Sequence, residues 1–374
     1  DSRVDIAPYD KDRVSWPDKG AIPVPLAAHL DKADCENLAN WESFMLRDKQ
    51  DFRQHISNSK TCKPYCDPSL FASRKTYADF LLRLHLAGML KFRRASGSQG
   101  SLGVFFVKKK DGTLRIIFDT RKLNLRFKDP PKTQLPTASA FSQLECPSEA
   151  NLSIAGGDIR NAFYGLSVPE DISNMFTLPF ISASDLDSSI VDSLPYDSNT
   201  LLAPCLTVLP MGWNWALHLC QSFSSNIVKT VCNPSRFFTD HSGSKVFDKQ
   251  ETCKATAYVD NYLVIGSDRK QVGELNKQIG KHLTDIGLQI HEVSQASHEG
   301  EFIGLEFRNN CFTVKTKRLW RLKFALQQLI QIPKCTGKLL EIVVGHITWC
   351  MLIRRESLAL LNFTYRFIAD NYDR

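Results

Sequence analysis

Residues 254–268 read KATAYVDNYLVIGSD, and this stretch says most about the fold of the 374-residue chain. Two apolar, β-prone runs flank a short polar tip that contains Asp260 and Asn261. Apolar runs joined by a short polar tip are typical of a β-hairpin. The stretch therefore predicts a hairpin that presents the Asp260 carboxylate at its turn.

A second carboxylate stands in a similar context. Residues 152–158 read LSIAGGD, an apolar β-prone segment that ends at Asp158. Because Asp158 and Asp260 both follow such segments, we expect both to project from one edge of a single sheet. Two carboxylates that converge repel each other unless a divalent cation neutralises them, and Mg²⁺ takes hard oxygen ligands of this kind. An isolated Asp is more often a turn former or a helix cap, so the inference depends on the pair.

The composition is that of a globular protein, with 43% hydrophobic and 23% charged residues and a net charge of +7. The 11 cysteines follow no paired spacing, which indicates reduced thiols and an intracellular location, in the cytoplasm or the nucleus. The sequence shows no signal peptide and no uninterrupted apolar run long enough to cross a bilayer, so we expect no membrane partner. The chain begins with Asp1 rather than Met, and we expect it to be a piece of a longer protein.

Basic residues gather between positions 91 and 128. This segment holds eleven Lys and Arg residues and only two acidic ones, Asp111 and Asp119. A field of that sign attracts phosphates, although a solvated lysine-rich face has the same composition. Within the segment, residues 104–107 and 114–118 have the pattern of strands, and Asp111 with Gly112 forms a turn signal between them. We therefore expect a hairpin with a basic tip.

The remaining segments mix helices with a further hairpin over residues 301–314. A polar stretch over residues 181–200, rich in Ser and Asp, predicts an exposed insertion. Apolar spacing or composition predicts helices in five places. These are residues 32–46, residues 69–90, the stretch after a turn at 210–213, residues 272–286 and most of residues 315–374. Hairpins mixed with helices indicate an α+β fold.

Five motifs resemble, in order and approximate spacing, those of reverse transcriptases from retrotransposons and retroviruses. They are residues 104–124 (VFFVKKKDGTLRIIFDTRKLN), similar to the fingers hairpin; 158–164 (DIRNAFY), similar to the first catalytic motif; 209–213 (LPMGW), similar to the template-contacting turn; 258–261 (YVDN), similar to the active-site box; and 301–306 (EFIGLE), similar to the primer grip. The family's box ends in two Asp residues, and Asn261 stands in place of the second. The resemblance extends over about residues 91–367 and suggests a Pol polyprotein of the retrotransposon or retroviral type.

The resemblance implies a right-hand polymerase with fingers, a palm built on an antiparallel sheet and a helical thumb. The implied boundaries are 1–85 for an N-terminal extension, 86–150 for the fingers, 151–307 for the palm with a fingers-like insertion at about 170–205, and 308–374 for the thumb. The implied partners are an RNA or DNA template with its primer, dNTPs and further Pol domains of a longer polyprotein.

The resemblance also implies roles in catalysis. Asp158, Asp260 and Asn261 would form the catalytic group. Asp158, Asp260 and the backbone oxygen of Ile159 would bind two Mg²⁺ ions, for which Mn²⁺ can substitute.

Relatives often have a Lys that donates a proton to the leaving pyrophosphate, but no Lys occurs between Leu288 and Val314. His298 is the candidate general acid in its place, and His291 is a less favoured one.

Two further sets of residues would bind the substrates. The incoming dNTP would meet Lys109 and Arg115 at its triphosphate, Phe163 under its sugar, and Met211 with Gly212 beside the templating base. The Phe163 ring would leave no room for a 2′-hydroxyl, although a core position also suits this ring. The primer end would contact a grip formed by Phe302, Ile303, Gly304 and Leu305. The duplex backbone would contact a basic segment of the thumb: Lys315, Lys317, Arg318, Arg321 and Lys323.

These features predict a nucleotidyltransferase, an RNA-directed DNA polymerase that extends a primer 3′-hydroxyl with dNTPs by a two-metal mechanism. The alternative is a related nucleic-acid-binding protein that Asn261 has weakened or inactivated, because one negative charge is lost from the box. A structural RNA-binding protein would explain the basic hairpin but not the pair Asp158 and Asp260. An inactivated relative should have lost residues across the site, so the presence of all five expected residues favours the active enzyme: Lys109, Arg115, Asp158, Phe163 and Asp260.

Overall fold

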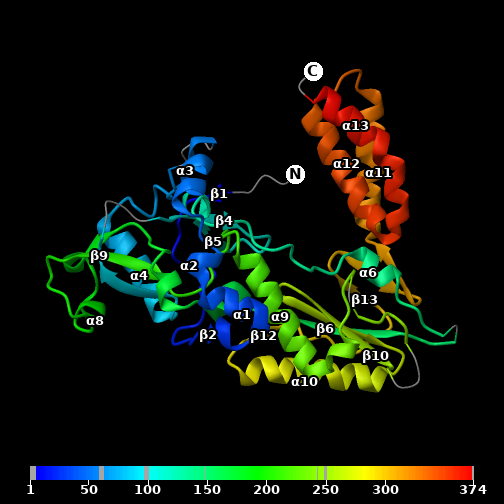
Figure 1. The fold of residues 1–374 in the computed structure, drawn as a ribbon, viewed down its shortest axis with the longest axis horizontal. Helices are drawn as coiled ribbons and strands as arrows, with labels where there is room; N and C mark the ends of the chain where they lie inside the picture. Colours follow the sequence, from blue (N-terminus) through cyan, green and yellow to red (C-terminus); the bar gives the residue numbers. More distant parts are fainter. Residues whose placement is uncertain are drawn as a thin grey trace. The chain divides into compact units, whose positions relative to one another are not determined.

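The computed structural model describes residues 6–58, 63–96, 101–147, 149–241, 243–247 and 251–372. The chain forms two compact units, each assembled from segments that are distant in the sequence (Figure 1). The first unit comprises Asp1–Thr133, Ile159–Asn226 and Leu283–Ile290, and the second comprises Gln134–Asp158, Ile227–His282 and His291–Arg374. None of the described helices is both long and apolar enough to cross a membrane.

The first unit contains the predicted basic hairpin, formed by β4 (Gly103–Lys108) and β5 (Leu114–Asp119). The side chains alternate along β5, because Leu114 and Ile116 are buried whereas Arg115 is exposed. Gly112, with a φ of 86°, turns the chain between the strands. A short strand, β1 (Ile6–Ala7), pairs with β4 and gives the sheet the order β1-β4-β5.

A second sheet of the first unit has the order β3-β9-β8, with β3 (Leu90–Arg94), β9 (Leu201–Leu206) and β8 (Ile181–Ser182). Before β3 runs α4 (Arg74–Leu86), whose apolar face is buried. The sequence placed the start of this helix at residue 69. The helix begins later because the Ser73 side chain accepts a hydrogen bond from the Thr76 N–H and caps the first turn.

The expected exposed insertion over residues 181–200 is wrong for its first half. This part folds into β8, a 3-10 turn and α8 (Ser188–Val191), and buries Ile181, Ala183 and Ile190. Ser and Asp residues serve the fold here, because Asp187 caps α8 by accepting a hydrogen bond from the Ser189 N–H. Leu186 is buried as well, so four buried apolar residues lie within this Ser- and Asp-rich sequence.

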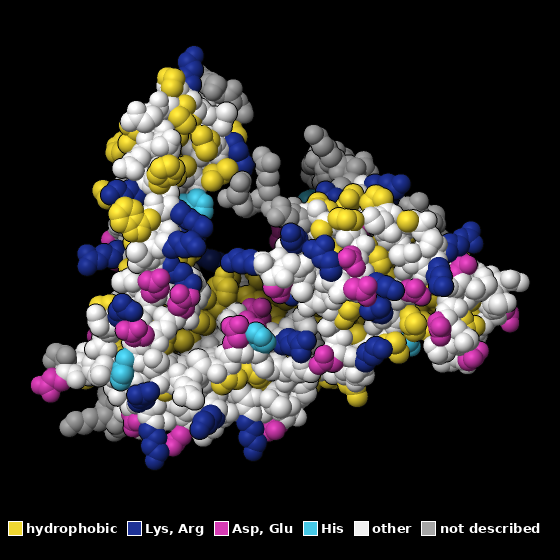
Figure 2. Space-filling view, turned by 180° about the vertical axis from the view of Figure 1, so that it is seen from behind, with side chains coloured by type: hydrophobic (Ala, Val, Ile, Leu, Met, Phe, Trp, Pro, Cys, Tyr) yellow, Lys and Arg dark blue, Asp and Glu magenta, His cyan; other side chains and the backbone are white. Residues whose placement is uncertain are grey.

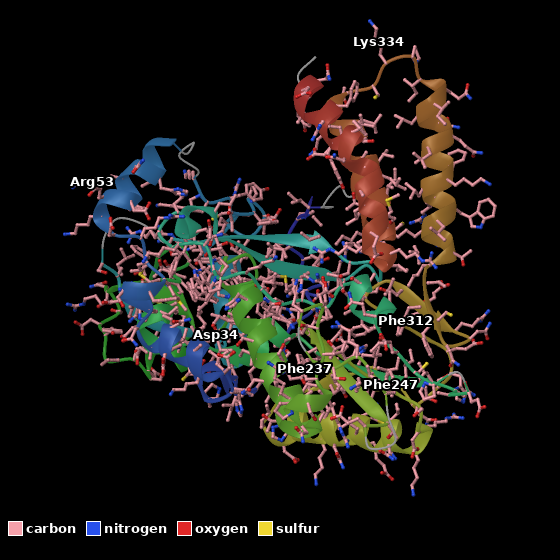
Figure 3. The ribbon with its side chains drawn as sticks, turned by 45° about the vertical axis from the view of Figure 1, so that its right-hand side comes forward. Asp34, Arg53, Phe237, Phe247, Phe312 and Lys334 are labelled. Atoms are coloured by element: carbon pink, nitrogen blue, oxygen red, sulfur yellow. The ribbon has the colours of Figure 1, made fainter. Side chains whose placement is uncertain are left out.

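Residues 26–58 add the short helices α1 (Lys32–Ala39), α2 (Trp41–Phe44) and α3 (Lys49–Asn58). Asp34 of α1 lies 3.0 Å from His218 Nε2, on α9 (Ala216–Cys232), the helix predicted after residue 213. Burial acts to raise the pKa of Asp34, but hydrogen bonds from His218 and Ser222 lower it overall. Figure 3 shows Asp34 inside the protein and Arg53 of α3 pointing outward. This segment is therefore packed into the first unit.

The second unit contains a sheet with the order β10-β11-β6-β12: β10 (Cys253–Tyr258), β11 (Asn261–Gly266), β6 (Ser153–Ile159) and β12 (Ile290–His291). The amphipathic helix predicted over residues 272–286 is α10 (Arg269–Asp285). A smaller sheet, β13 (Gly300–Phe302), β14 (Leu305–Arg308) and β15 (Cys311–Val314), carries the predicted second hairpin. A core that includes Phe141, Leu263, Ile265, Phe302 and Leu305 joins the two sheets.

The chain after residue 315 is helical, as predicted: α11 (Thr316–Gln331), α12 (Gly337–Met351), the 3-10 segment η5 (Leu352–Leu361) and α13 (Asn362–Asn371). No described residue of α11 is buried. Figure 2 shows hydrophobic side chains beside Lys and Arg over these helices, and Figure 3 shows Lys334 at the loop between α11 and α12. A mixed surface of this kind suits contact with a partner.

Two glycines allow β11 to approach β6 closely. A Cβ added to Gly156 would lie 2.4 Å from the Tyr262 carbonyl oxygen, and one added to Gly157 would lie 2.8 Å from the Tyr262 hydroxyl. The Tyr262 side chain is buried over Gly157, and burial raises its pKa to about 12. The strand that leads to Asp158 therefore needs glycine at both positions.

The substitution Gly156→Ala should destabilise the protein by about 2 kcal/mol or more, because the new methyl group meets a backbone atom that cannot rotate away. Urea unfolding followed by circular dichroism measures this change. Gly345→Ala in α12 is the matched control, since its methyl group would meet no atom within 4 Å. That control should stabilise the exposed helix by up to about 1 kcal/mol. Equal effects of the two substitutions would contradict the close approach at Gly156.

Candidate active site

The predicted hairpin at residues 254–268 is present and is closed by a two-residue turn. β10 pairs antiparallel with β11, and Tyr258 lies opposite Asn261. The turn residues are therefore Val259 and Asp260, and Val259 has a φ of 55°. A β-branched residue in the left-handed region is strained by about 1–2 kcal/mol, so the strand pairing must hold the turn. This arrangement puts Asp260 at the hairpin tip.

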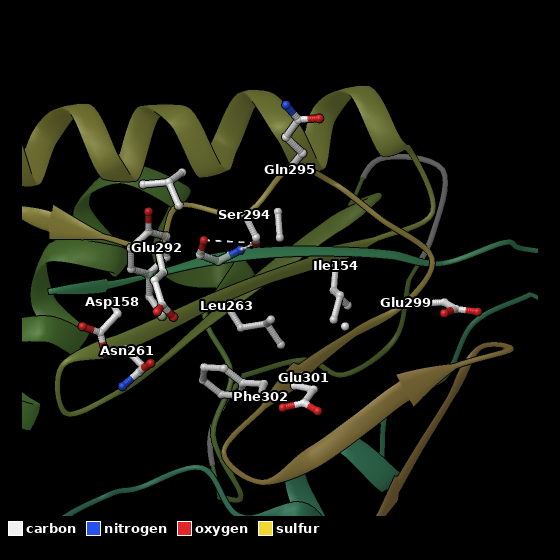
Figure 4. A pocket seen from close by; sticks show the side chains of 16 residues that line it. Ile154, Asp158, Asn261, Leu263, Glu292, Ser294, Gln295, Glu299, Glu301 and Phe302 are labelled. Atoms are coloured by element: carbon white, nitrogen blue, oxygen red, sulfur yellow. Dashed lines mark hydrogen bonds between the residues drawn. The ribbon is translucent and has the colours of Figure 1, made fainter. Parts of the chain in front are cut away.

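Asp158 lies on the strand next to this tip. β6 pairs antiparallel with β11, and in that register Asp158 faces Asn261, the residue after Asp260. Burial and then the negative charge of Asp260 raise the pKa of the half-buried Asp158 to about 6. Figure 4 shows the Asp158 and Asn261 side chains next to each other. The two carboxylates thus converge on one sheet edge, as the sequence predicted.

Asn261 acts as a hydrogen-bond donor between the two carboxylates. Its Nδ2 donates to Asp260 Oδ1 at 2.8 Å, and its hydrogen bond to Asp158 lowers the pKa of that carboxyl, against the larger effect of burial. An aspartate at this position would add a third negative charge, whereas the amide partly compensates the two that are present. The sequence showed the missing charge but not this donor role.

A cleft of ≈ 400 Å³ runs along β6 from Ile154 to Asp158 (Figure 4). Three further carboxylates line it, from Glu292, Glu299 and Glu301. A hard divalent cation between Asp158 and Asp260 would offset the repulsion that raises the pKa of Asp158, so the donor set fits such an ion. Within the described ranges, no group of three or more His, Cys, Asp and Glu side chains is arranged to hold a metal ion. A bound cation would therefore need oxygen ligands from the backbone or from a substrate as well.

The five residues predicted to hold a dNTP all belong to the first unit: Lys109, Arg115, Phe163, Met211 and Gly212. Lys109 lies in the turn of the basic hairpin, where its N–H donates to the Thr113 carbonyl, and Arg115 lies on β5 opposite Val107. Phe163 lies in one turn that contacts β5, and Met211 and Gly212 lie in a second turn that contacts it.

The turn that carries Phe163 is fixed to β5 by its neighbour. Phe163 is partly exposed in the 3-10 segment η2 (Ala162–Gly165). The buried Tyr164 donates its hydroxyl to the Ile116 carbonyl at 2.8 Å, and its ring packs edge-on against Phe118. Tyr164 is a positioning residue that the sequence analysis missed, although its place beside Phe163 was a signal.

The turn that carries Met211 and Gly212 approaches the other end of β5. A Cβ on Gly212, whose φ is 113°, would lie 3.2 Å from the Phe118 carbonyl oxygen. Asn124, which follows β5, donates Nδ2 to the Gly212 carbonyl at 2.9 Å and accepts from the Asn214 N–H at 3.1 Å. The sequence motif that ends at Asn124 gave no indication of this role. The hydrogen bonds of Asn124 to the turn join residues that are distant in the sequence.

The predicted primer-grip residues form the turn between β13 and β14. Phe302 and Leu305 pair across the hairpin and are buried in the core, whereas Ile303 and Gly304 are the turn residues, with φ values of 43° and 83°. A Cβ on Gly304 would lie 3.2 Å from the ring of Trp349 on α12. The turn therefore touches the C-terminal helices.

The basic residues predicted to follow the duplex backbone lie on α11 and where the β13–β14 turn meets α12. Lys315 forms an ion pair with Glu301, and the Arg318 guanidinium lies over the Trp349 ring at 3.6 Å. Lys323 lies 4.9 Å from the centre of the Trp320 ring. The remaining two, Lys317 and Arg321, are exposed on the same helix.

The two candidate general acids lie at different ends of β6. His298 Nδ1 is 2.9 Å from the Leu152 carbonyl and 3.3 Å from Ser153 Oγ, at the start of the strand. A strand rises about 3.3 Å per residue, which puts roughly 17 Å between Ser153 and Asp158. His291 is the imidazole near Asp158, because its positive charge lowers the pKa of that carboxyl.

The raised pKa of Asp158 predicts a pH-dependent stability in the absence of metal. The carboxyl has a pKa of about 6 in the folded state against 3.8 for an unperturbed Asp, so its favourable contribution is complete below about pH 4 and is lost as the pH rises through 6. Asp158→Asn should therefore be more stable than the wild type at pH 8, by on the order of 1–2 kcal/mol after allowance for solvent screening. Chemical unfolding in EDTA at pH 4 and pH 8 measures this.

The exposed Asp370 of α13 provides the control, since Asp370→Asn makes the same substitution at a solvent-exposed position and should change stability little. If Asp158→Asn were more stable than the wild type at pH 4 as well, the added stability would not come from removal of the carboxylate charge.

Comparison with known proteins identifies the family. Residues 107–307 match the profile of the family described as "Reverse transcriptase (RNA-dependent DNA polymerase)", and this match covers more than half of the chain. No curated protein matches the sequence significantly. The matched residues include the basic hairpin from Val107 onward, Asp158, the Asp260 turn and the turn at Ile303 and Gly304. The chain belongs to the reverse transcriptase (RNA-dependent DNA polymerase) family.

Proposed function

We propose that this chain is a template-directed DNA polymerase that transfers nucleotides from dNTPs to a primer 3′-hydroxyl. Membership of the family supports reverse transcription in general. The observation that carries the proposal is the register of β6 and β11, which sets Asp158 opposite Asn261 and so beside Asp260 at one sheet edge. Paired carboxylates, one of which lines an acidic cleft, suit metal-assisted phosphoryl transfer better than structural binding of RNA.

The architecture we propose is a right hand. The fingers would be residues 86–150, with an insertion at about 170–205; the palm 151–307; the thumb 308–374; and residues 1–85 an extension. The antiparallel order β10-β11-β6 supports a palm, and the basic β4–β5 hairpin supports fingers. The helices after residue 315 support a thumb.

Two Mg²⁺ ions, or Mn²⁺ in their place, would be held by the Asp158 and Asp260 side chains and the Ile159 backbone oxygen. When bound, these ions activate the primer hydroxyl and offset the charge on the leaving pyrophosphate. Asn261 keeps Asp260 oriented through its 2.8 Å hydrogen bond. His291 is better placed than His298 to move a proton near Asp158, because His291 interacts with that carboxyl, whereas His298 is hydrogen-bonded to the Leu152 carbonyl at the start of β6.

The nucleotide would be bound by side chains that gather on β5. Lys109 and Arg115 would pair with the triphosphate, Arg115 as a forked donor and Lys109 as a point charge. Phe163, which Tyr164 fixes against β5, would lie under the sugar. Met211 and Gly212 would line the pocket beside the templating base, and Asn124 holds their turn in place.

The primer end would rest on the turn of residues 302–305. The duplex backbone would follow the basic residues Lys315, Lys317, Arg318, Arg321 and Lys323, a contact that should weaken with salt and not depend on sequence. Trp349 contacts both the primer-grip turn and the basic segment, since it packs on Gly304 and under the Arg318 guanidinium.

Primer extension tests the proposal directly. Purified protein with a poly(rA) template, an oligo(dT) primer, dTTP and Mg²⁺ should extend the primer. Asp260→Asn should reduce the rate about 100-fold or more, because one of two acidic metal ligands loses its charge. Asn261→Asp should keep activity and lower the Mg²⁺ concentration needed for half-maximal rate.

The weakened-enzyme alternative has one supporting observation, the amide donor at Asn261 in place of a carboxylate. If the wild type fails to extend the primer in Mg²⁺ and in Mn²⁺ while Asn261→Asp succeeds, the active-enzyme proposal is refuted and the alternative stands.

Phe163 provides a test of sugar selection. Phe163→Ala should lower the preference for dTTP over UTP by on the order of tenfold or more, because the 2′-hydroxyl gains room. Steady-state kcat/KM for both nucleotides measures this. Phe163→Tyr keeps the ring and is the matched control, with discrimination close to that of the wild type. Unchanged discrimination in Phe163→Ala would refute the assigned role.

A further inference from the structure

The N-terminal residues 6–16 contact both edges of the β4–β5 hairpin. On one edge, β1 pairs with β4 through Ile6 opposite Val107 and Ala7 opposite Phe106. On the other edge, Val14 bridges to Leu114 of β5. Both pairings lie next to the turn that joins the strands, at the end of the hairpin that carries Lys109 and Gly112. We call residues 6–16 the N-terminal clamp.

The second edge is fixed at the residue before Arg115. The Leu114 N–H donates to the Arg13 carbonyl at 2.7 Å, and the Leu114 carbonyl accepts from the Ser15 N–H at 2.9 Å. Both backbone groups of Leu114 that face away from β4 are thus satisfied by the clamp. An edge strand without such a neighbour would leave them to solvent and would be freer to bend.

Arg13 also binds the hairpin turn through its side chain. Its Nε and Nη2 both donate to the Gly112 carbonyl, at 3.2 and 2.8 Å. Gly112 in turn donates its N–H to the Lys109 carbonyl at 3.0 Å. Since exposed glycine turns are among the most mobile parts of a hairpin, a forked bond to this carbonyl restricts the turn that carries Lys109.

Aromatic packing anchors the clamp to the body of the first unit. The Tyr9 ring lies 5.0 Å from Phe106 and 5.8 Å from Phe80, and the Trp16 ring lies 5.7 Å from Phe80. Phe80 and Phe106 are fully buried. Tyr9 and Trp16 therefore pack against buried rings on both sides of Arg13 in the sequence, and this packing fixes the backbone that carries the guanidinium.

From these contacts we infer that Arg13 is a positioning residue for triphosphate binding. It acts through Gly112 and Leu114 to hold Lys109 and Arg115 in the geometry that receives the phosphates. This inference rests on the proposed function. Preorganised donors bind an anion more tightly because less conformational freedom is lost on binding. Asp10 and Asp12 lie in the same turn and offset the charge of Arg13, which favours a positioning role over direct attraction of phosphate.

Two measurements on Arg13→Ala test the inference. Hydrogen–deuterium exchange without nucleotide should show faster exchange of the amides of residues 109–114 and no change in β10 and β11. Primer extension should show a KM for dTTP raised about fivefold or more, with kcat and primer–template affinity little changed. Arg13→Lys should give exchange rates and a KM for dTTP between those of Arg13→Ala and the wild type, since a single ammonium cannot reproduce the forked bond.

Lys11→Ala is the matched control. It removes the same charge from the same turn, and its backbone carbonyl, which accepts from Trp16 Nε1, is retained. Unchanged exchange in Arg13→Ala, or an equal rise in KM for Lys11→Ala, would overturn the inference. Faster exchange with an unchanged KM would also overturn it. A wild-type chain that neither extends primers nor binds dTTP would instead refute the proposed function, and the exchange experiment would still decide whether Arg13 fixes the hairpin.

Discussion

The candidate site depends on the register in which β11 lies against β6. Asp158 faces Asn261 only because the strands pair as they do, and Asp260 precedes Asn261 at the hairpin tip. A slip of one residue would turn every side chain of β6 to the opposite face and separate the carboxylates. Gly156 and Gly157 permit this register, since a side chain at either would collide with Tyr262. The glycines before Asp158 are therefore as much a part of the site as the aspartate.

The candidate-site residues of the two units, each taken by itself, carry opposite charges. In the second unit, burial and then the negative charge of Asp260 raise the pKa of Asp158 near the end of β6. In the first unit, the basic β4–β5 hairpin is held by Arg13, which donates to the Gly112 carbonyl, and by Tyr164, which donates to the Ile116 carbonyl. These opposite charges suit the metal ion and the triphosphate that the proposed function requires. Each environment is stabilised by its own local contacts, and neither relies on the pairing of long exposed side chains.

Sequence reasoning identified the parts with strong local signals. The hairpins at residues 104–118 and 254–268 were predictable because apolar alternation and turn residues coincide there. The pairing of Asp158 with Asp260 followed from two strand-end positions. Residues 181–200 were misjudged because Ser and Asp that cap helices resemble Ser and Asp of an exposed loop.

Other features of the site depend on tertiary contacts that no local pattern records. The donor role of Asn261, the distance of His298 from Asp158 and the stacking of Arg318 on Trp349 all belong to this class. The bond from Tyr164 to Ile116 joins residues 48 positions apart and could not be read from spacing.

The interleaved composition of the two units has a consequence for synthesis on the ribosome. The first unit needs Leu283–Ile290 in addition to its N-terminal segments, and the second begins at Gln134. Neither can therefore finish folding before residue 290 has left the exit tunnel, and the nascent chain must keep apolar surface uncovered until then. Chains dominated by such distant pairings fold slowly and are exposed to aggregation. Expression of shortened pieces that end before residue 290 should thus give incomplete units, whichever of the two units is wanted.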